Sequence, residues 1–342
     1  MKVETGTYRI VEGPYLRDIL DQPRALAATL EHLQIPKTLL MLGQNLREGR
    51  LKRIVLTGMG ASFYALHPIF LRLNAHGYTT IMVETSELIH SLKRWLEPEA
   101  LIVAVSQSGQ SAEIVRLIEE NKGHAPVVGV TNAEESLLAT RANAGMVTMA
   151  GRESSVSCKT YVTALMTLHM LAEFLCGRDE GKARAELAQA APAVGSYLEG
   201  WKDRVIEMAV RLGQVRHLFL LGRGESLAAC GAGALILKES VRVHAEGMSG
   251  AAFRHGPLEM VDGETFAVLF AGAESTRALQ ERLAEDIRQA GGRTEWIAAD
   301  AALPLQPILE ILPVQMITLA LAAEAGIEAG RFGRIAKITT TE

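Results

Sequence analysis

Residues 55–62 read VLTGMGAS and residues 219–226 read FLLGRGES, two apolar runs that each end in a Gly-x-Gly turn followed by a serine. One offset relates them, since 222 − 58 = 164 for their first glycines. The same offset aligns VSQSGQS (105–111) with LFAGAES (269–275). Two independent segments in one register predict a duplicated domain.

Short apolar runs alternate with amphipathic segments around these turns. Strands that are apolar on both faces and separated by helices indicate a parallel sheet covered on both sides. We therefore expect an α/β fold with two tandem domains, each a parallel sheet between two helical layers. The strands expected in the first half are RIVLTG (53–58), TTIMVET (79–85), ALIVAVS (100–106), PVVGVTN (126–132) and MVTMA (146–150), and the second half repeats this pattern from HLFLLG (217–222) onward.

The organisation along the chain follows from changes in composition. A charged, alanine-rich and proline-interrupted stretch near the middle reads as a linker helix, and a last helix is expected near residues 314–325. The predicted parts are a helical leader (1–40), a first domain that binds the phosphosugar (41–180), the linker helix (181–200), a second domain (201–328) and a tail (329–342).

Composition excludes several classes of protein. The 342 residues carry 35 Lys and Arg against 39 Asp and Glu, so the net charge of −4 disfavours nucleic-acid binding. The N-terminus has no apolar signal region, and no apolar run approaches the roughly 20 residues that a membrane helix needs. The three cysteines are Cys158, Cys176 and Cys230, which form no close pair and indicate reduced thiols. We expect a cytoplasmic protein without a membrane partner.

The SQSGQS turn carries the strongest chemical signal. It lies between an apolar strand and a helix, where ligands bind in α/β folds and where a helix N-terminus favours anions. The hydroxyls of Ser106, Ser108 and Ser111 and the amide of Gln107 add neutral donors, and Gly109 allows close backbone approach. A phosphate monoester fits such a cradle. The alternative is that Ser111 only caps the helix.

The GMGAS turn is a weaker signal. A dinucleotide site would need a third glycine, but position 63 is Phe, so a nicotinamide cofactor is disfavoured. Gly60 allows a tight turn, and Ser62 is a candidate donor to a sugar hydroxyl or phosphate, unless it too only caps a helix. The nine histidines show no metal-binding spacing, so we expect no metal site.

Three ionisable residues outside these turns are candidates for proton transfer and covalent chemistry. Glu239 ends an apolar helix, and His255 lies in a His-Gly-Pro turn. A carboxylate and an imidazole near a sugar are what aldose–ketose isomerisation needs. Lys337 has apolar neighbours, so we expect the tail to dock and the lysine to be able to form an imine with a carbonyl sugar. For Glu239 the alternative is a structural salt bridge.

Taken in order, GMGAS, SQSGQSAE, GRESSVSCKTY, GRGES, LKESVRVHAE, FRHGP and RIAKIT resemble the tandem sugar-isomerase (SIS) domain family. The chain resembles the isomerase half of glutamine–fructose-6-phosphate aminotransferases. Also similar are the SIS-type glucosamine-6-phosphate deaminases and the fructosamine-phosphate deglycases. By this resemblance the substrate-binding residues are Gly60, Ser62, Ser106, Gln107, Ser108, Ser111 and, through its backbone, Val156.

The resemblance also implies catalytic roles and a partner. Glu239 matches the glutamate that moves a proton between C1 and C2, and His255 matches a ring-opening histidine that reaches across a homodimer interface. Lys337 matches the lysine that forms the imine with a ketose phosphate. No metal or organic cofactor is implied, because an imine already acidifies the neighbouring C–H bond.

Two features favour breakdown of an amino-sugar or fructosamine 6-phosphate over its synthesis. The aminotransferases have a second lysine where this chain has Ile236, and the chain starts at the leader without a glutaminase domain that would supply ammonia. Two alternatives stay open. One is a simple aldose–ketose phosphosugar isomerase in which Lys337 is structural, and the other is a non-catalytic protein that binds sugar phosphates.

Overall fold

The computed structural model describes residues 10–299, 304–334 and 336–339. The chain forms two compact units that interleave along the sequence. Unit 1 consists of Met1–Asp21, Ser154–Ser157 and Pro192–Gly333, and unit 2 consists of Gln22–Glu153, Cys158–Ala191 and Arg334–Glu342. The predicted leader therefore contributes its first helix to unit 1 and its next two helices to unit 2.

Unit 2 contains a five-stranded parallel sheet in the order β2-β1-β3-β4-β5. The central strands are buried along their whole length, because helices cover both faces. The strands are β1 (Arg53–Gly58), β2 (Thr80–Glu84), β3 (Ala100–Val105), β4 (Val127–Thr131) and β5 (Ala144–Val147).

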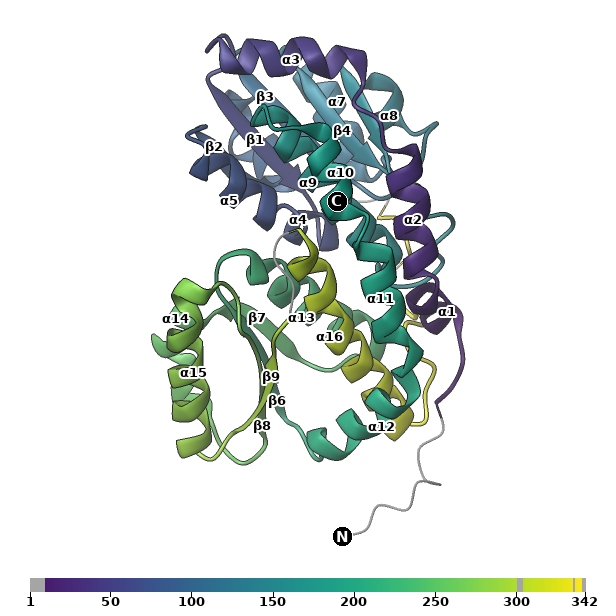
Figure 1. The fold of residues 1–342 in the computed structure, drawn as a ribbon, viewed down its shortest axis with the longest axis vertical. Coiled ribbons are helices and arrows are strands. Elements are labelled where there is room, and N and C mark those ends of the chain that lie inside the picture. Colours follow the sequence, from purple (N-terminus) through teal and green to yellow (C-terminus); the bar gives the residue numbers. More distant parts are fainter. Residues whose placement is uncertain (1–9, 300–303, 335, 340–342) are drawn as a thin grey trace. The chain divides into compact units, whose positions relative to one another are not determined.

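Two helical layers enclose this sheet (Figure 1). One layer packs an apolar core onto one face and consists of α6 (Thr85–His90), α7 (Ala112–Asn121) and α8 (Leu137–Arg141). The other layer is built around the long buried helix α9 (Lys159–Leu175) and includes α2 (Gln22–His32), α3 (Lys37–Arg47), α5 (His67–Ala75) and α10 (Glu180–Leu187). The short helices α4 (Ala61–Tyr64) and η1 (Lys93–Trp95) complete the unit.

Unit 1 repeats the arrangement with four parallel strands in the order β7-β6-β8-β9. The strands are β6 (His217–Gly222), β7 (Ala245–Ser249), β8 (Thr265–Phe270) and β9 (Arg293–Ile297). One face is covered by α14 (Gly250–Arg254) and α15 (Glu274–Gln289), the other by α12 (Trp201–Leu212), α13 (Leu227–Val241) and α16 (Leu305–Glu324). Also in unit 1 are α1 (Pro14–Leu20), most of α11 (Ala190–Glu199), η2 (Gly224–Ser226) and η3 (Pro257–Met260).

The predicted fold class is confirmed, since each unit is a parallel sheet between two helical layers. The single register of the two halves is wrong in detail. The first strands of the two units, β1 and β6, are related by an offset of 217 − 53 = 164 residues. Arg53 of β1 pairs with Ala100 of β3, and His217 of β6 pairs with Thr265 of β8, so β3 and β8 are related by an offset of 265 − 100 = 165 residues. One extra residue between β6 and β8 therefore shifts the equivalence of β3 and β8.

Helix α16 corrects two expectations from the sequence. It is 20 residues long and begins at Leu305, not near 314, because Pro313 lies inside the helix. Its mean hydropathy of 1.5 makes it long and apolar enough to cross a membrane, so the expectation that no such run exists was wrong. However, 72% of its most apolar window is buried inside the structure, which is the behaviour of a core helix.

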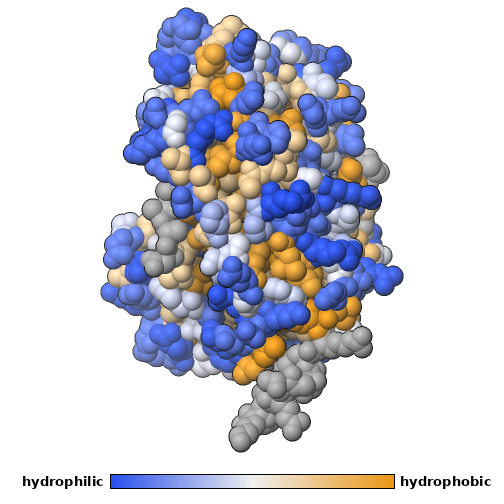
Figure 2. Space-filling view, turned by 45° about the vertical axis from the view of Figure 1, so that its right-hand side comes forward, coloured by the Kyte–Doolittle hydropathy of each residue, from blue (hydrophilic) through white to orange (hydrophobic). Residues whose placement is uncertain are grey.

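The molecular surface is mostly polar. Figure 2 shows one face on which hydrophilic side chains cover most of the area, with separate hydrophobic patches. The large hydrophobic side chains that are exposed belong to different elements, for example Met41 in α3, Val210 in α12 and Leu279 in α15. Isolated exposed hydrophobic residues of this kind are normal for a globular protein.

Candidate active site

The two polar turns of unit 2 follow neighbouring strands. Gly58 at the end of β1 is in register with Val105 at the end of β3, so the GMGAS and SQSGQS turns meet at the carboxyl edge of one sheet. Gly60 has φ 53°, a left-handed conformation that glycine adopts without strain. Ser62 lies inside α4 and does not cap it, since Gly60 is the N-cap. The half-buried Ser62 side chain therefore lies beside the SQSGQS turn as a candidate donor.

The hydroxyl groups of the SQSGQS turn accept short-range hydrogen bonds. Ser106 Oγ accepts from the N–H of Gly109 at 3.2 Å, and Ser108 Oγ accepts from the N–H of Gln110 at 3.3 Å. Each hydroxyl keeps its own hydrogen as a donor for a ligand. Ser111 is the N-cap residue of α7, but its side chain makes no capping hydrogen bond, so capping does not explain this serine.

Burial of the turn is uneven. Ser106 and Ser108 are only 8% and 7% exposed, whereas Gln107 and Ser111 are half-buried. The burial of Ser106 and Ser108 argues against an anion site that is fully exposed to solvent. The two half-buried residues are the donors that a ligand reaches first, and the buried pair can contribute only to a group that enters deeply.

Gly109 holds the turn in its shape. Its φ is 61°, and a Cβ at this position would lie 2.1 Å from Ser136 Oγ and 2.8 Å from Thr131 Oγ1. No side chain fits there. The close approach puts the turn directly against the segment that follows β4.

Asn132 is a structural residue that the sequence analysis missed. Its N–H donates to the carbonyl of Gln107 at 3.1 Å, and its Oδ1 accepts from Thr148 Oγ1 at 3.0 Å and from the N–H of Ala150 at 2.9 Å. Asn132 thus ties the SQSGQS turn to the loop that follows β5. An asparagine directly after a buried strand was the available signal.

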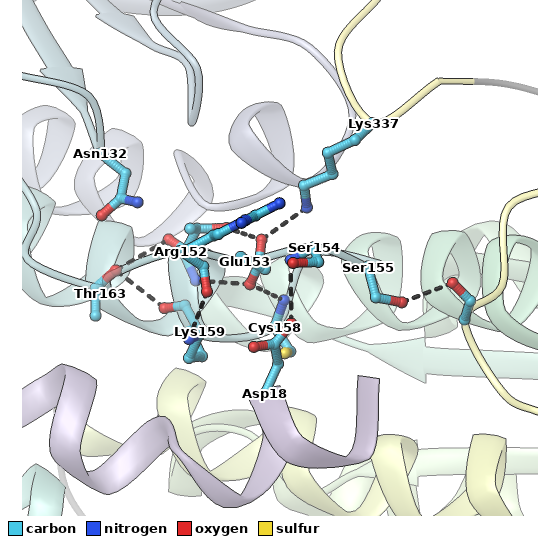
Figure 3. A network of polar contacts seen from close by, with 12 residues as sticks. Asp18, Asn132, Arg152, Glu153, Ser154, Ser155, Cys158, Lys159, Thr163 and Lys337 are labelled. Atoms are coloured by element: carbon cyan, nitrogen blue, oxygen red, sulfur yellow. Dashed lines mark hydrogen bonds and ion pairs between the residues drawn. The ribbon is translucent and has the colours of Figure 1, made fainter. Parts of the chain in front are cut away.

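The C-terminal tail docks on unit 2, as predicted. The carbonyl of Thr339 accepts from the N–H of Ala112 at 3.1 Å, in the first turn of α7. Lys337 Nζ lies 2.8 Å from Glu153 Oε2 (Figure 3). The tail therefore brings the lysine to the loop after β5 and places its own backbone at the helix that begins beside Ser111.

Glu153 is the second residue that the sequence analysis missed. Its side chain is 0% exposed, and its Oε1 accepts from the N–H groups of Cys158 at 2.9 Å and Thr160 at 3.1 Å. Its Oε2 accepts from Thr160 Oγ1 at 2.6 Å as well as from Lys337. The carboxylate therefore lies at the N-terminus of α9, where the helix dipole favours a negative charge.

The remaining predicted site residues belong to unit 1. Glu239 is half-buried near the end of α13, and His255 is exposed just after α14. Val156 is fully buried, and Ile236, the residue that replaces a family lysine, is 1% exposed. The position of these residues relative to the turns of unit 2 stays a prediction.

The equivalent edge of unit 1 is filled by its own side chains. Ser226 Oγ and Gln306 Nε2 both donate to Glu310 Oε1 at 2.8 Å. Glu310 is 1% exposed, and its Oε2 has no hydrogen-bond partner among the described residues. Burial raises the pKa of Glu310 to about 7. Across residues 10–299, 304–334 and 336–339, no cluster of three or more His, Cys, Asp or Glu side chains could hold a metal.

Comparison with known proteins gives a consistent relationship. The family model described as "SIS domain" matches residues 50–174 and 211–307. The chain is 30% identical over 363 residues to the glutamine–fructose-6-phosphate aminotransferase (isomerizing) of Pyrococcus horikoshii. That alignment covers 99% of this chain but only 59% of the relative, so the chain spans less than two thirds of the relative's length.

Two solved structures share the fold over nearly the whole chain. One is the C-terminal domain of a glucosamine-fructose-6-phosphate aminotransferase from Francisella tularensis, with a TM-score of 0.83, 20% identity, and coverage of 96% of this chain and 100% of that one. The other is a glucosamine-6-phosphate deaminase from Thermotoga maritima, with a TM-score of 0.77, 19% identity, and coverage of 96% and 100%. The named reactions differ, so the shared fold alone does not select between them.

Proposed function

The chain belongs to the SIS domain family, and from this premise we propose that it is an enzyme that breaks down an amino-sugar or fructosamine 6-phosphate. The proposed reaction is deamination or deglycation coupled to isomerisation. The names of the relatives and structural neighbours support a phosphorylated amino sugar as the substrate class. The proposal includes a cytoplasmic homodimer, with His255 of one protomer acting in the site of its partner.

One observation carries the proposal. Lys337 lies against Glu153, and two residues later the tail bonds to the first turn of α7, beside the SQSGQS turn. A potential imine-forming amine and a set of phosphate donors therefore belong to the same edge of one sheet. A sugar phosphate needs both, one at its carbonyl end and one at its phosphate end.

In the proposed reaction the donors of the SQSGQS turn, with Ser62 and the backbone at Gly60 and Val156, hold the phosphorylated sugar. The amine of Lys337 forms an imine with the ketose carbonyl carbon, which acidifies the C–H bond beside it. By the family resemblance, His255 assists ring opening and Glu239 moves the proton between C1 and C2.

A screen of amino-sugar and fructosamine 6-phosphates, read as release of ammonia or free amine, tests this proposal. Lys337→Ala is expected to lower turnover by about 10²-fold or more, because the imine supplies the acidification. Lys182→Ala, which removes an exposed lysine of the same unit, is the control and is expected to leave turnover unchanged.

A simple aldose–ketose isomerase is the second candidate. The Lys337–Glu153 ion pair favours it if the pair only docks the tail. In that case Lys337→Ala retains sugar-phosphate isomerisation and no variant releases ammonia. A third outcome, in which sugar phosphates raise the melting temperature of the parent chain without turnover, would identify a binding protein.

A further inference from the structure

Glu153 is a carboxylate within ion-pairing distance of the Lys337 ammonium. The separation of 2.8 Å is within the range over which a proton passes directly between two groups. The lysine side chain is 21% exposed and the glutamate side chain is 0% exposed, so bulk water has little access to the carboxylate.

The pair poses a chemical problem for imine formation. The lysine side chain of an ion pair is an ammonium ion, and an ammonium nitrogen has no lone pair with which to attack a carbonyl. The lysine must therefore lose a proton before the attack. A second proton transfer is needed later, because the carbinolamine oxygen has to leave as water.

We propose, on the basis of the function proposed above, that Glu153 is the catalytic group that takes this proton from Lys337 and later returns it. The Glu153 carboxylate first accepts a proton from the ammonium. The neutral amine then forms a bond to the carbonyl carbon, and the C=O π electrons move to oxygen. A proton shift from nitrogen to oxygen gives the neutral carbinolamine.

The second half of the step restores both groups. The protonated Glu153 donates to the carbinolamine hydroxyl, the C–O bond breaks, and water leaves while the nitrogen lone pair forms the C=N bond. The products are a protonated imine and the Glu153 carboxylate as its counterion. Three protons on the ammonium thus become one on the iminium and two in water, with no external acid or base.

The hydrogen bonds of Glu153 suit this role. Oε1 is held by two backbone N–H groups at the start of α9, which fix the plane of the carboxylate. Oε2 faces Lys337 (Figure 3). The same oxygen also accepts from Thr160 Oγ1 at 2.6 Å. A carboxylate fixed in this way is already oriented towards the nitrogen, which is the preorganisation that proton transfer requires.

A structural role for Glu153, in which it caps α9 and docks the tail, is the competing explanation. Glu173 provides a matched control, since it is a buried carboxylate within α9, whereas Glu153 lies in the loop just before that helix. Glu173 also forms ion pairs with basic side chains, Arg72 and Arg178. Glu173→Gln removes a buried carboxylate of unit 2 without touching Lys337. Loss of stability alone should therefore be shared by both glutamine variants.

The test is the rate at which Lys337 becomes covalently labelled. The chain is mixed with fructose 6-phosphate and sodium cyanoborohydride, and the reduced adduct on Lys337 is measured by mass spectrometry over time. Glu153→Gln is expected to slow labelling by about 10²-fold or more while sugar-phosphate affinity, from calorimetry, changes less than about threefold. Glu173→Gln is expected to label at the parent rate.

Two results would overturn the proposal, and they have different meanings. Labelling of Glu153→Gln at the parent rate would leave Glu153 as a docking residue and the proposed function intact. A parent chain that binds fructose 6-phosphate but is never labelled would remove the imine itself, and with it the proposed function. If Glu153→Gln does not fold, Glu153→Asp keeps the charge but withdraws the carboxylate, and is expected to slow labelling by about 10-fold or more.

Discussion

Glu153 of unit 2 and Glu310 of unit 1 are both buried glutamates, and the two side chains have different kinds of partner. Glu153 of unit 2 accepts from a lysine ammonium, a hydroxyl and two backbone N–H groups. Within the described part of the chain, Glu310 of unit 1 accepts from a neutral hydroxyl and a neutral amide, both on one oxygen. Four strands of each sheet have the same order, so the different partners of the two glutamates come from segments outside the sheets.

The glycines of the two edges sharpen this comparison. Gly109 and Gly272 have nearly the same φ, 61° and 64°. A Cβ at Gly109 would lie 2.1 Å from Ser136 Oγ, whereas a Cβ at Gly272 would find nothing closer than 3.6 Å. The turn at Gly109 therefore has no room for a methyl group, whereas the turn at Gly272 accepts one at ordinary van der Waals distances.

The largest effect is expected from alanine at these two positions. Gly109→Ala adds overpacking to left-handed strain and is expected to lower the free energy of unfolding by about 3–4 kcal/mol. Gly272→Ala adds only the strain, about 1–2 kcal/mol. Urea unfolding of both variants measures the difference. Equal losses would show that the two edges are packed alike.

The second prediction concerns the pH dependence of stability in unit 1. The pKa of Glu310 is raised to about 7, so the folded state binds its proton more tightly than the unfolded state does. The contribution of Glu310 to the free energy of unfolding is therefore fully present below the unfolded pKa of about 4.5 and is lost as the pH rises to about 7. Above that pH the contribution of Glu310 does not change further. Glu310→Gln keeps the shape and removes this loss.

Thermal and urea unfolding of Glu310→Gln at several pH values test that reasoning. At pH 8 the variant is expected to be more stable than the parent by up to about 3 kcal/mol, and near pH 5 the two should agree within about 1 kcal/mol. A variant that is less stable than the parent at pH 8 would mean that the ionised carboxylate has favourable partners at this edge.

The smallest effect concerns single hydroxyl groups. Ser111→Ala removes one proposed donor to the phosphate and is expected to weaken sugar-phosphate binding about 10-fold, since hydrogen bonds to charged groups are worth about 1.5 kcal/mol or more. Ser226→Ala, at the other edge, is expected to leave the affinity unchanged. Calorimetric titration with one sugar phosphate measures both, and a similar loss in both variants would contradict the assignment of the site to unit 2.

Much of the fold was readable from local patterns. The buried strands β1, β3 and β4 are largely apolar, and glycine-containing turns follow β1 and β3. Where the local sequence pattern was ambiguous, the observed boundaries of helices and strands differ from the predicted ones. β7 is a short strand with the polar residues Glu246 and Ser249, and it lies at the edge of its sheet, so its sequence does not show two buried faces.

The candidate site was readable only in part, for a physical reason. A phosphate turn is local, so its donors lie within a few residues of one another. Glu153 and Lys337 are 184 residues apart in the sequence, and the sequence around Glu153 does not predict which basic side chain it contacts. Asn132 likewise joins three segments that only tertiary structure brings together.

The interleaving of the two units has a consequence for synthesis on the ribosome. Almost all of unit 2 lies within residues 22–191, whereas unit 1 needs residues on both sides of that stretch. Tyr15 of α1 accepts a hydrogen bond from the hydroxyl group of Thr318 in α16. The first helix therefore reaches its final contacts only after the last helix has been synthesised. If domains fold as units during synthesis, the part of unit 2 within residues 22–191 can form while the opening helix of the chain is still without its final partner, and the tail of unit 2 is added last.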